Sequence, residues 1–402
     1  MHWGKGERRG HDTALDGIRG LAILLVLLWH WGVPLPPASR FHSYSVALVS
    51  CGWMGVDVFF ALSGFLITGI LVDSMDGERP LRNFYVRRVL RIFPLYYGVL
   101  LLTFAAALAM RLGGYRKFLL LLFYLQNTGL GVRQDQFGIG PFDFGVYWSL
   151  AVEEQFYLMW PMVVFLVRDR RKLLWIALSL SMTALVLRTL LLFSGSSRLN
   201  IYCWMPCRMD ALLIGGALAL AMRSADFDSD LIHKVLRWSG WGVAAWISML
   251  LVLVIRNHDL AWFNSRFMQT AGFTIIALGA ASLIAWTQRP GCGSFFRMGW
   301  LRFFGRYSYG IYILFYLLYA PLYRGLGRDF FGRILHNVTL AKILGILTAE
   351  ALTVGVAVLS FKFYETPFLK LKRKFEYRNR AESADLEQHR ESVRGRVSGG
   401  LD

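Results

Sequence analysis

Residues 15–33 read LDGIRGLAILLVLLWHWGV, an apolar run long enough to cross a membrane as one helix. Arg19 stands near the start of this run, and His30 follows eleven residues later. Eleven residues make about three turns of an α-helix, so the two side chains share one face and lie roughly 16 Å apart along the axis. Because ionisable side chains are costly at membrane depth, both residues are candidates for a functional site.

Apolar windows of similar length recur along the chain. Of its 402 residues, 55% are hydrophobic and only 17% are charged. We therefore predict an all-α fold, a polytopic transmembrane bundle of about ten helices. The predicted spans are residues 15–33, 47–72, 90–110, 146–167, 173–193, 203–222, 239–256, 268–287, 305–323 and 343–363. The apolar segment 118–124 is too short to cross and is predicted to be interfacial or re-entrant.

Basic residues are distributed unevenly between the two sets of connecting segments. Most of the 44 lysines and arginines fall in segments that share a side with the N-terminus, so the positive-inside rule places both termini in the cytosol. We predict a cytosolic N-terminal segment at 1–14, a transmembrane domain at 15–368, and a basic, disordered cytosolic tail at 369–402. The net charge of +18 follows this topology and does not indicate nucleic-acid binding.

The four cysteines indicate neither a disulfide framework nor a metal site. Cys51, Cys203, Cys207 and Cys292 all lie in or beside apolar stretches. Cys203 and Cys207 are one helical turn apart, which would suit a metal, but small buried side chains are the preferred interpretation. We predict that the protein uses no metal.

Several other ionisable residues are predicted at the depth of His30. Counting helix rise along the spans gives this set: Asp57, Glu153, Glu154, Arg208 and Asp210. Charges in hydrocarbon persist when they are paired or face a wet cavity. We interpret His30 as a general base, because imidazole titrates near neutral pH. The alternative is a histidine that only forms a hydrogen bond between helices.

The paired glutamates have separate predicted roles. Glu153 has Ser149 and Tyr157 one turn away on either side, so it is placed to orient the base. Glu154 points about 100° away and is expected to do different work. A structural salt bridge, for example with Arg208, is the alternative for this pair.

The remaining charges of this set admit more than one interpretation. Asp57 lies in GVDVFF at 55–60 and is either a functional carboxylate or a cap or ion-pair partner. Arg208 and Asp210 are predicted to form a local ion pair.

A second constellation is basic and opens the third span. Residues 85–94 read YVRRVLRIFP, in which Arg87, Arg88 and Arg91 cluster on one side of a helix. Guanidinium groups suit phosphate, so we interpret the cluster as a phosphate-binding site. Ordinary anchoring at a cytosolic surface is the alternative for any single arginine.

The two predicted sites lie on the order of 15–20 Å apart by helix rise. A ligand that bridges them needs a phosphorylated head at the inner face and a long thin arm that reaches the base. Acyl-CoA has this shape, because its pantetheine arm ends in a thioester. The hypothesis is therefore a cytosolic acyl-CoA donor.

Seven ordered stretches give the chain a resemblance to a known family. They are residues 15–30, 55–66, 84–91, 148–157, 208–216, 306–312 and 364–368. On these the chain resembles the acyltransferase 3 family of integral membrane O-acyltransferases over nearly all of its membrane region. The motif residues of the family fall on Arg19, His30, Arg88, Arg91, Glu153 and Glu154.

The resemblance implies a multipass protein of the bacterial cytoplasmic membrane that moves an acyl group from cytosolic acyl-CoA, with acetyl-CoA as the expected donor, to a hydroxyl. The expected acceptor is a saccharide or a glycosylated or lipid-linked compound. Where relatives often carry a histidine, Leu314-Phe315-Tyr316 stands here, which predicts a different acceptor preference. Many relatives also carry a hydrolase-like domain outside the membrane; here we expect direct acylation of the acceptor or transfer to a separate partner.

Three groups of residues make up the predicted site. Those predicted to be catalytic are His30, Glu153, Glu154 and Asp57. Those predicted to bind the donor are Arg19, Arg87, Arg88 and Arg91, with pairing to Asp16 as an alternative for Arg19. Those predicted to bind the acceptor are Ser149, Tyr157, Arg208 and Asp210. The predicted partners are membrane lipids, the acyl-CoA donor and a saccharide acceptor, and the oligomeric state is left open.

Direct attack by the acceptor hydroxyl, with His30 taking its proton, is the preferred mechanism. An acyl-enzyme route through Ser63 or Ser149 is less favoured, because neither hydroxyl stands clearly beside a base in the sequence. The competing function is a proton-coupled secondary transporter with His30, Asp57 and Glu153 as its relay. A transmembrane scaffold or receptor is a third alternative.

Overall fold

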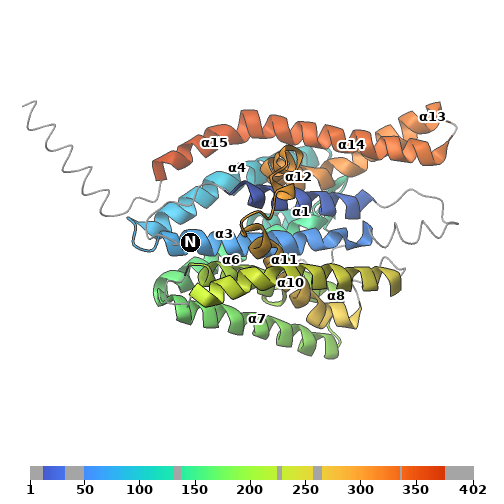
Figure 1. Ribbon diagram of the computed structural model, residues 1–402. Helices are drawn as coiled ribbons and strands as arrows, with labels where there is room; N and C mark the ends of the chain where they lie inside the picture. Colours follow the sequence, from blue (N-terminus) through green and yellow to red (C-terminus); the bar gives the residue numbers. More distant parts are fainter. Residues whose placement is uncertain are drawn as a thin grey trace, which may run out of the picture.

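The computed structural model describes residues 12–31, 49–129, 137–223, 229–256, 265–335 and 337–375. Within these ranges the chain forms a bundle of long helices, most of which run parallel or antiparallel to one another (Figure 1). The predicted all-α class is confirmed, because the described part contains just one two-stranded sheet, β1 (Gly138–Ile139) with β2 (Phe142–Asp143). Residues 1–11 and 376–402, which hold most of the two predicted cytosolic ends, lie outside the described residues.

The described helices follow one another along the chain, with short elements among the long ones. In order they are α1 (Thr13–Trp31), α3 (Gly55–Asp73), α4 (Pro80–Ala109), α5 (Tyr115–Leu122), α6 (Trp148–Val167), α7 (Arg170–Phe193), α8 (Arg198–Cys203), α9 (Met205–Ala221), α10 (Ser229–Arg256), α11 (Phe273–Thr287), α12 (Gly299–Leu322), α13 (Gly332–Ile334), α14 (Val338–Ser360) and α15 (Thr366–Leu371). Wider π-helical turns precede α11 and join α14 to α15.

Nine helical stretches of the described chain are long and apolar enough to cross a membrane. They correspond to nine of the ten predicted spans. The tenth, predicted at 305–323, falls in α12, which has 24 residues but is less apolar because it carries five tyrosines. The predicted short piece at 118–124 overlaps α5, which has eight residues.

Two helices continue beyond their predicted ends. α4 begins at Pro80, ten residues before the predicted span, and helical structure after α14 continues to Phe375. Residues 369–375 therefore do not belong to a disordered tail. Arg87 Nη1 donates to the carbonyl oxygens of Lys372, at 3.1 Å, and Phe375, at 3.2 Å, which ties the two polar ends together. Hydropathy misses such a contact because the two segments are far apart in the sequence.

Glycines allow the central helices to approach closely. Gly64 of α3 faces the carbonyl of Leu212, and Gly215 of α9 faces the carbonyl of Ala61, so a methyl group at either glycine would overlap the opposing backbone. Small residues of this kind permit the dense van der Waals contact that holds membrane helices together. α1 packs on α12 in the same way through Gly20, which brings the His30 face of α1 against α12.

Pro94 lies inside α4 and removes one helical hydrogen bond. The hydroxyl of Tyr309 donates to the Ile92 carbonyl at 2.6 Å, and that of Tyr364 donates to the Pro94 carbonyl at 3.0 Å. Hydroxyl donors from neighbouring helices satisfy backbone groups near a proline in a membrane helix. These two bonds tie α4 to α12 and to the π-helical turn Phe361–Glu365 near Arg91 and Pro94.

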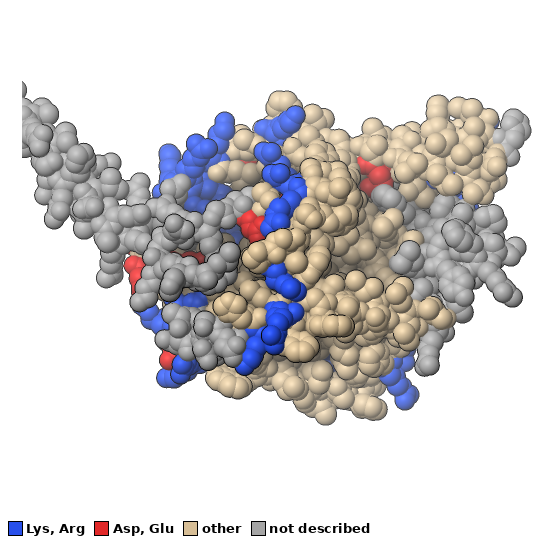
Figure 2. Space-filling view, in the orientation of Figure 1, with Lys and Arg blue, Asp and Glu red and all other residues tan. Residues whose placement is uncertain are grey.

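Lysine and arginine side chains gather on one part of the molecule. Figure 2 shows them on the left of this face, around the start of α4 and the end of α15, and in a column at its centre over the region of α12, while the described surface on the right shows few of them. The charge asymmetry predicted from the sequence is thus present on the folded surface.

Candidate active site

A cavity of about 730 Å³ lies between the end of α1 and the starts of α6 and α8. Its walls are largely aromatic, with polar groups between the rings. The ring-bearing residues of the wall are Trp29, His30, Trp53, Trp148, Tyr202, Tyr312 and Tyr316, and the charged ones are Asp143 and Arg198. A concave, mostly apolar site with a few polar groups is the usual form of a small-molecule site.

His30 lines this cavity, and its ring is held in one orientation. His30 Nδ1 lies 2.8 Å from the carbonyl oxygen of Val26, one turn earlier on α1. Because a carbonyl can only accept, Nδ1 carries the proton, and Nε2 of the neutral ring has its lone pair free. The ring also packs edgewise on Phe315 and Tyr316 of α12, with ring centroids 5.0 and 5.3 Å away. The predicted alternative, a hydrogen bond between helices, is wrong, since the bond lies within α1.

Glu153 does not orient His30. Its Oε1 accepts from Ser63 Oγ at 2.8 Å, and its Oε2 accepts from the Tyr157 hydroxyl at 3.1 Å. The predicted orienting role therefore belongs to the Val26 carbonyl, because the neighbouring turn of the same helix reaches the imidazole first. The contact between Ser63 of α3 and Glu153 joins residues 90 positions apart, so no local pattern predicts it.

Glu154 has quite different surroundings. It makes no side-chain hydrogen bond within the described part of the chain, and it remains partly exposed. The carboxylate of Glu154 lies within electrostatic range of the hydroxyls of Tyr97, Tyr124 and Tyr309 and of the guanidinium of Arg88. The predicted divergence of the two glutamates is thus present in the fold.

Three arginines converge below Glu153. Arg88 lies over the ring of Tyr157, with Cζ 5.4 Å from its centroid, and its charge interacts with those of Arg19 and Arg91. Arg19 Nη1 is 3.8 Å from Asp16 Oδ1, and its side chain keeps 30% of its surface exposed. Gathering three cations costs free energy that a bound anion would offset.

Two further basic residues lie near this cluster. Arg87 was grouped with the donor-binding arginines, but its Nη1 binds the backbone carbonyls of Lys372 and Phe375. Lys372 was not predicted, yet its charge interacts with Arg91, Arg88, Arg87 and Arg19. Lys372 lies far from α1 and α4 in the sequence, so no local pattern could have indicated its place beside these arginines.

The remaining predicted charges form buried ion pairs between helices. Arg208 Nη2 lies 2.6 Å from Asp57 Oδ1, and Arg188 Nη2 lies 2.8 Å from Asp210 Oδ2, with all four side chains at most 1% exposed. The predicted local pair of Arg208 with Asp210 is wrong, because residues two apart on a helix point to nearly opposite sides. Neither pair presents surface to a substrate, so the predicted acceptor contacts and the catalytic use of Asp57 find no support in this geometry. Arg188 was not predicted as a partner of Asp210, and its position inside the predicted span 173–193 was the feature of the sequence that could have indicated a buried ion pair.

Tyr312 and Ser149 lie at the boundary of the cavity. The Tyr312 hydroxyl donates to the Val146 carbonyl at 2.9 Å and is 2.6 Å from Ser149 Oγ. Ser149 is one turn before Glu153 on α6, and Tyr157 follows one turn later, beside Arg88. The cavity wall includes Tyr312 but neither the glutamates nor the three arginines. In this structure the cavity therefore does not extend to the glutamates or to the three arginines.

The domain that contains this site is similar to known proteins. A family model described as an acyltransferase domain, that of acyltransferase 3, matches residues 12–362. The peptidoglycan O-acetyltransferase OatA of Listeria monocytogenes serovar 1/2a (strain ATCC BAA-679 / EGD-e) is 28% identical over 90% of this chain and 56% of its own length. YrhL of Bacillus subtilis (strain 168), provisionally named a peptidoglycan O-acetyltransferase, is 29% identical over the same shares.

The chain thus spans a little over half the length of these curated relatives. A protein of Staphylococcus aureus (strain COL), provisionally named an O-acetyltransferase, is 26% identical over 91% of this chain and 58% of its own length. No solved structure matches the fold significantly.

Proposed function

Because the chain belongs to the acyltransferase 3 family, we propose that it is an O-acyltransferase of a bacterial cytoplasmic membrane that uses cytosolic acyl-CoA. The acceptor is a saccharide hydroxyl. The observation that carries the proposal is the His30 imidazole, which lines an aromatic cavity and is held by the Val26 carbonyl in the form that accepts a proton at Nε2. The names of the relatives support acetyl as the acyl group and a peptidoglycan-type saccharide as the acceptor.

His30 acts as general base in the proposed reaction. Its Nε2 takes the proton of the acceptor hydroxyl while that oxygen attacks the thioester carbonyl of the donor. The carbon–sulfur bond then breaks, and the imidazolium returns the proton to the leaving sulfur. The products are the O-acyl ester and free CoA, and the imidazole is neutral again.

The arginines Arg19, Arg88 and Arg91 hold the donor by its phosphates. Their mutual repulsion favours an anion among them, and guanidinium groups bind phosphate oxygens in pairs. From Arg19 to His30 the rise of α1 is roughly 16 Å, a distance that the pantetheine arm spans. The thioester reaches the cavity when the Tyr312 ring leaves the wall between the two regions.

The aromatic cavity holds the acceptor. Sugar rings pack an apolar face on aromatic side chains, and their hydroxyls need polar partners. Asp143 and Arg198 supply charged partners in the wall. Burial raises the pKa of the Asp143 carboxyl, although the backbone N–H of Gly145, 2.8 Å from its Oδ1, partly opposes this.

The test uses the full chain in lipid nanodiscs with acetyl-CoA and soluble peptidoglycan fragments. We expect free thiol to appear only when the saccharide is present, together with an acetylated product seen by mass spectrometry. His30→Gln keeps a polar side chain of similar reach and is expected to abolish both signals while the protein remains folded. A transporter or scaffold would release no thiol under any condition, and that result would refute the proposal.

A further inference from the structure

A second cavity, of about 350 Å³, lies between the start of α4 and residues 373–375. The residues that line it are Glu78, Arg79, Arg82, Asn83, Arg373, Lys374 and Phe375. Four of them are cations and one is a carboxylate. The lining of this cavity includes none of Arg19, Arg88 and Arg91, and on α4 the nearest of them, Arg88, follows Arg82 by six residues, about 9 Å of helix.

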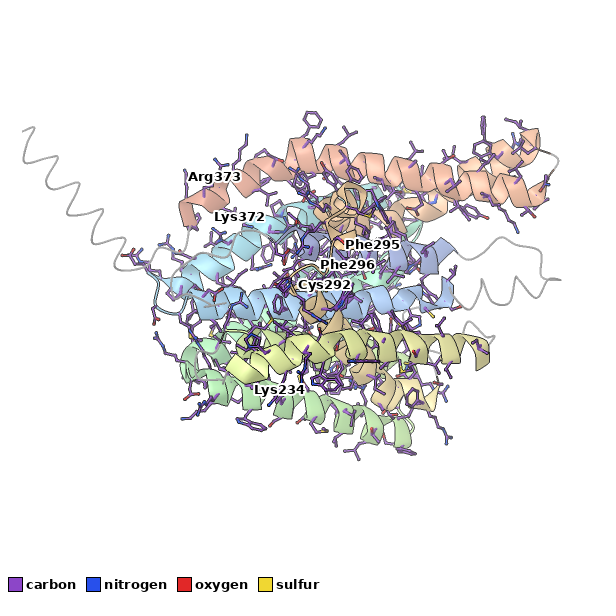
Figure 3. The ribbon with its side chains drawn as sticks, viewed as in Figure 1. Lys234, Cys292, Phe295, Phe296, Lys372 and Arg373 are labelled. Carbon is purple, nitrogen blue, oxygen red and sulfur yellow. The ribbon has the colours of Figure 1, made fainter. Side chains whose placement is uncertain are left out.

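The walls of this second cavity are held in place by specific contacts. Arg87, on the next turn of α4, donates to the carbonyls of Lys372 and Phe375 in the C-terminal segment. Arg82 Cζ lies 5.8 Å from the ring centroid of Phe375. Asn83 Nδ2 donates to the Glu78 carbonyl at 3.1 Å, which fixes the loop before the helix. Figure 3 shows Lys372 and Arg373 on the C-terminal segment at this end of the bundle.

Arg79 occupies a costly backbone conformation in order to stand there. Its φ of 48° and ψ of 50° lie in the left-handed region, which glycine adopts freely and arginine does not. Pro80 follows at the first position of the helix and fixes the geometry of this entry. A residue that strains the backbone and carries charge at the rim of a basic cavity indicates a use for its side chain.

The cations of the second cavity are available to a ligand. Within the described chain, Arg79, Arg82, Arg373 and Lys374 form no ion pair. Their combined charge exceeds that of Glu78, so the cavity attracts anions. Guanidinium groups bind phosphate oxygens two at a time, and the Phe375 ring offers a face for a flat group.

We propose that this cavity is a phosphate-binding site, for a ligand that carries a phosphate ester. Two ligands supply such a phosphate ester: the nucleotide head of the acyl-CoA donor and the headgroup of an anionic phospholipid at the cytosolic surface. The first source extends the donor site down α4 and rests on the proposed function. The second is independent of it.

The experiment compares three variants of the full chain in nanodiscs. Arg79→Gly removes the charge and also the backbone strain, so its thermal stability is expected to equal or exceed that of the unaltered protein. Arg373→Ala with Lys374→Ala removes the charges of the opposite wall. Arg302→Ala is the matched control, because Arg302 is an exposed arginine of α12 that does not line the cavity.

Two binding measurements separate the sources, and neither depends on turnover. Calorimetry compares CoA with 3′-dephospho-CoA, and native mass spectrometry compares retention of phosphatidylglycerol with that of phosphatidylcholine. If the nucleotide is the ligand, both cavity variants lose about tenfold in CoA affinity, as expected for one charged hydrogen-bonded contact, and lose the preference for the 3′-phosphate. If the lipid is the ligand, CoA binding is unchanged and retained phosphatidylglycerol falls.

The proposal is overturned if both cavity variants bind CoA and phosphatidylglycerol as the unaltered protein does. It is also overturned if Arg302→Ala produces the same loss, since the effect would then be general surface charge. Failure of the proposed acyl transfer gives a different result: no thiol release by the unaltered protein, whatever binds at this cavity.

Discussion

The ion pair between Asp57 and Arg208 makes opposite predictions for a catalytic and a structural carboxylate. Arg208 is fully buried, and within the described chain its single hydrogen bond goes to Asp57 Oδ1 at 2.6 Å, while its Nε and Nη1 have no partner. The replacement Asp57→Ala takes away that one bond and leaves the guanidinium among aromatic rings, of which Phe273 is 4.1 Å away. The charge then has no compensating partner on α3.

Breaking a buried ion pair by removing one partner typically costs about 3–5 kcal/mol, because an uncompensated charge stays buried. We take this range for Asp57→Ala. The double replacement Asp57→Val with Arg208→Met removes both charges at nearly the same total volume, and it is expected to recover most of that loss. Specific activity per folded molecule should stay close to that of the unaltered protein, since neither side chain reaches the cavity.

The assay is equilibrium unfolding in mixed micelles, followed by tryptophan fluorescence, with thiol release measured on the folded fraction. His30→Gln is the counter-control: it should lose activity and keep its stability. The reasoning fails if Asp57→Ala unfolds at the same denaturant concentration as the unaltered protein while losing turnover. In that case Asp57 takes part in the chemistry, as the sequence first suggested.

Four further outcomes follow from the site. For His30→Gln, with Nε2 gone, thiol release should fall by at least about a hundredfold, the usual contribution of a general base, in a stopped-time thiol assay. Glu153→Gln should lower thermal stability more than Glu154→Gln, because only Glu153 accepts from two hydroxyls; equal shifts would contradict this. Tyr312→Phe loses two hydrogen bonds, about 1–3 kcal/mol, and should raise the rate of acyl-CoA entry in single-turnover experiments. Burial raises the pKa of the Asp143 carboxyl, so the stability of the folded protein falls as the pH rises from the pKa of this group in the unfolded chain through its pKa in the fold. Asp143→Asn should therefore stabilise the protein at about pH 8 and have little effect below the pKa of Asp143 in the unfolded chain, and thermal scans can check both.

Much of the candidate site was accessible from local patterns. The spacing of Arg19 and His30 places them on one face of α1, and the spacing of Arg88 and Arg91 places both on one face of α4. Helical periodicity also separates Glu153 from Glu154, whose surroundings do differ in the fold. These predictions depend on residues within a few turns of each other, where the geometry of the helix is fixed in advance.

By itself the sequence determined the helical class, nine of the spans, and the helix face of the ionisable residues, because hydropathy and the 3.6-residue period are properties of neighbouring residues. Only the tertiary structure decided which charges pair. It joined Asp57 to Arg208 and Asp210 to Arg188, brought Lys372 to the arginine cluster, and bonded the Tyr312 hydroxyl to the Val146 carbonyl at the wall of the cavity. Such choices depend on how helices rotate and approach one another, and glycine contacts such as that of Gly64 with Leu212 settle this only when distant segments pack.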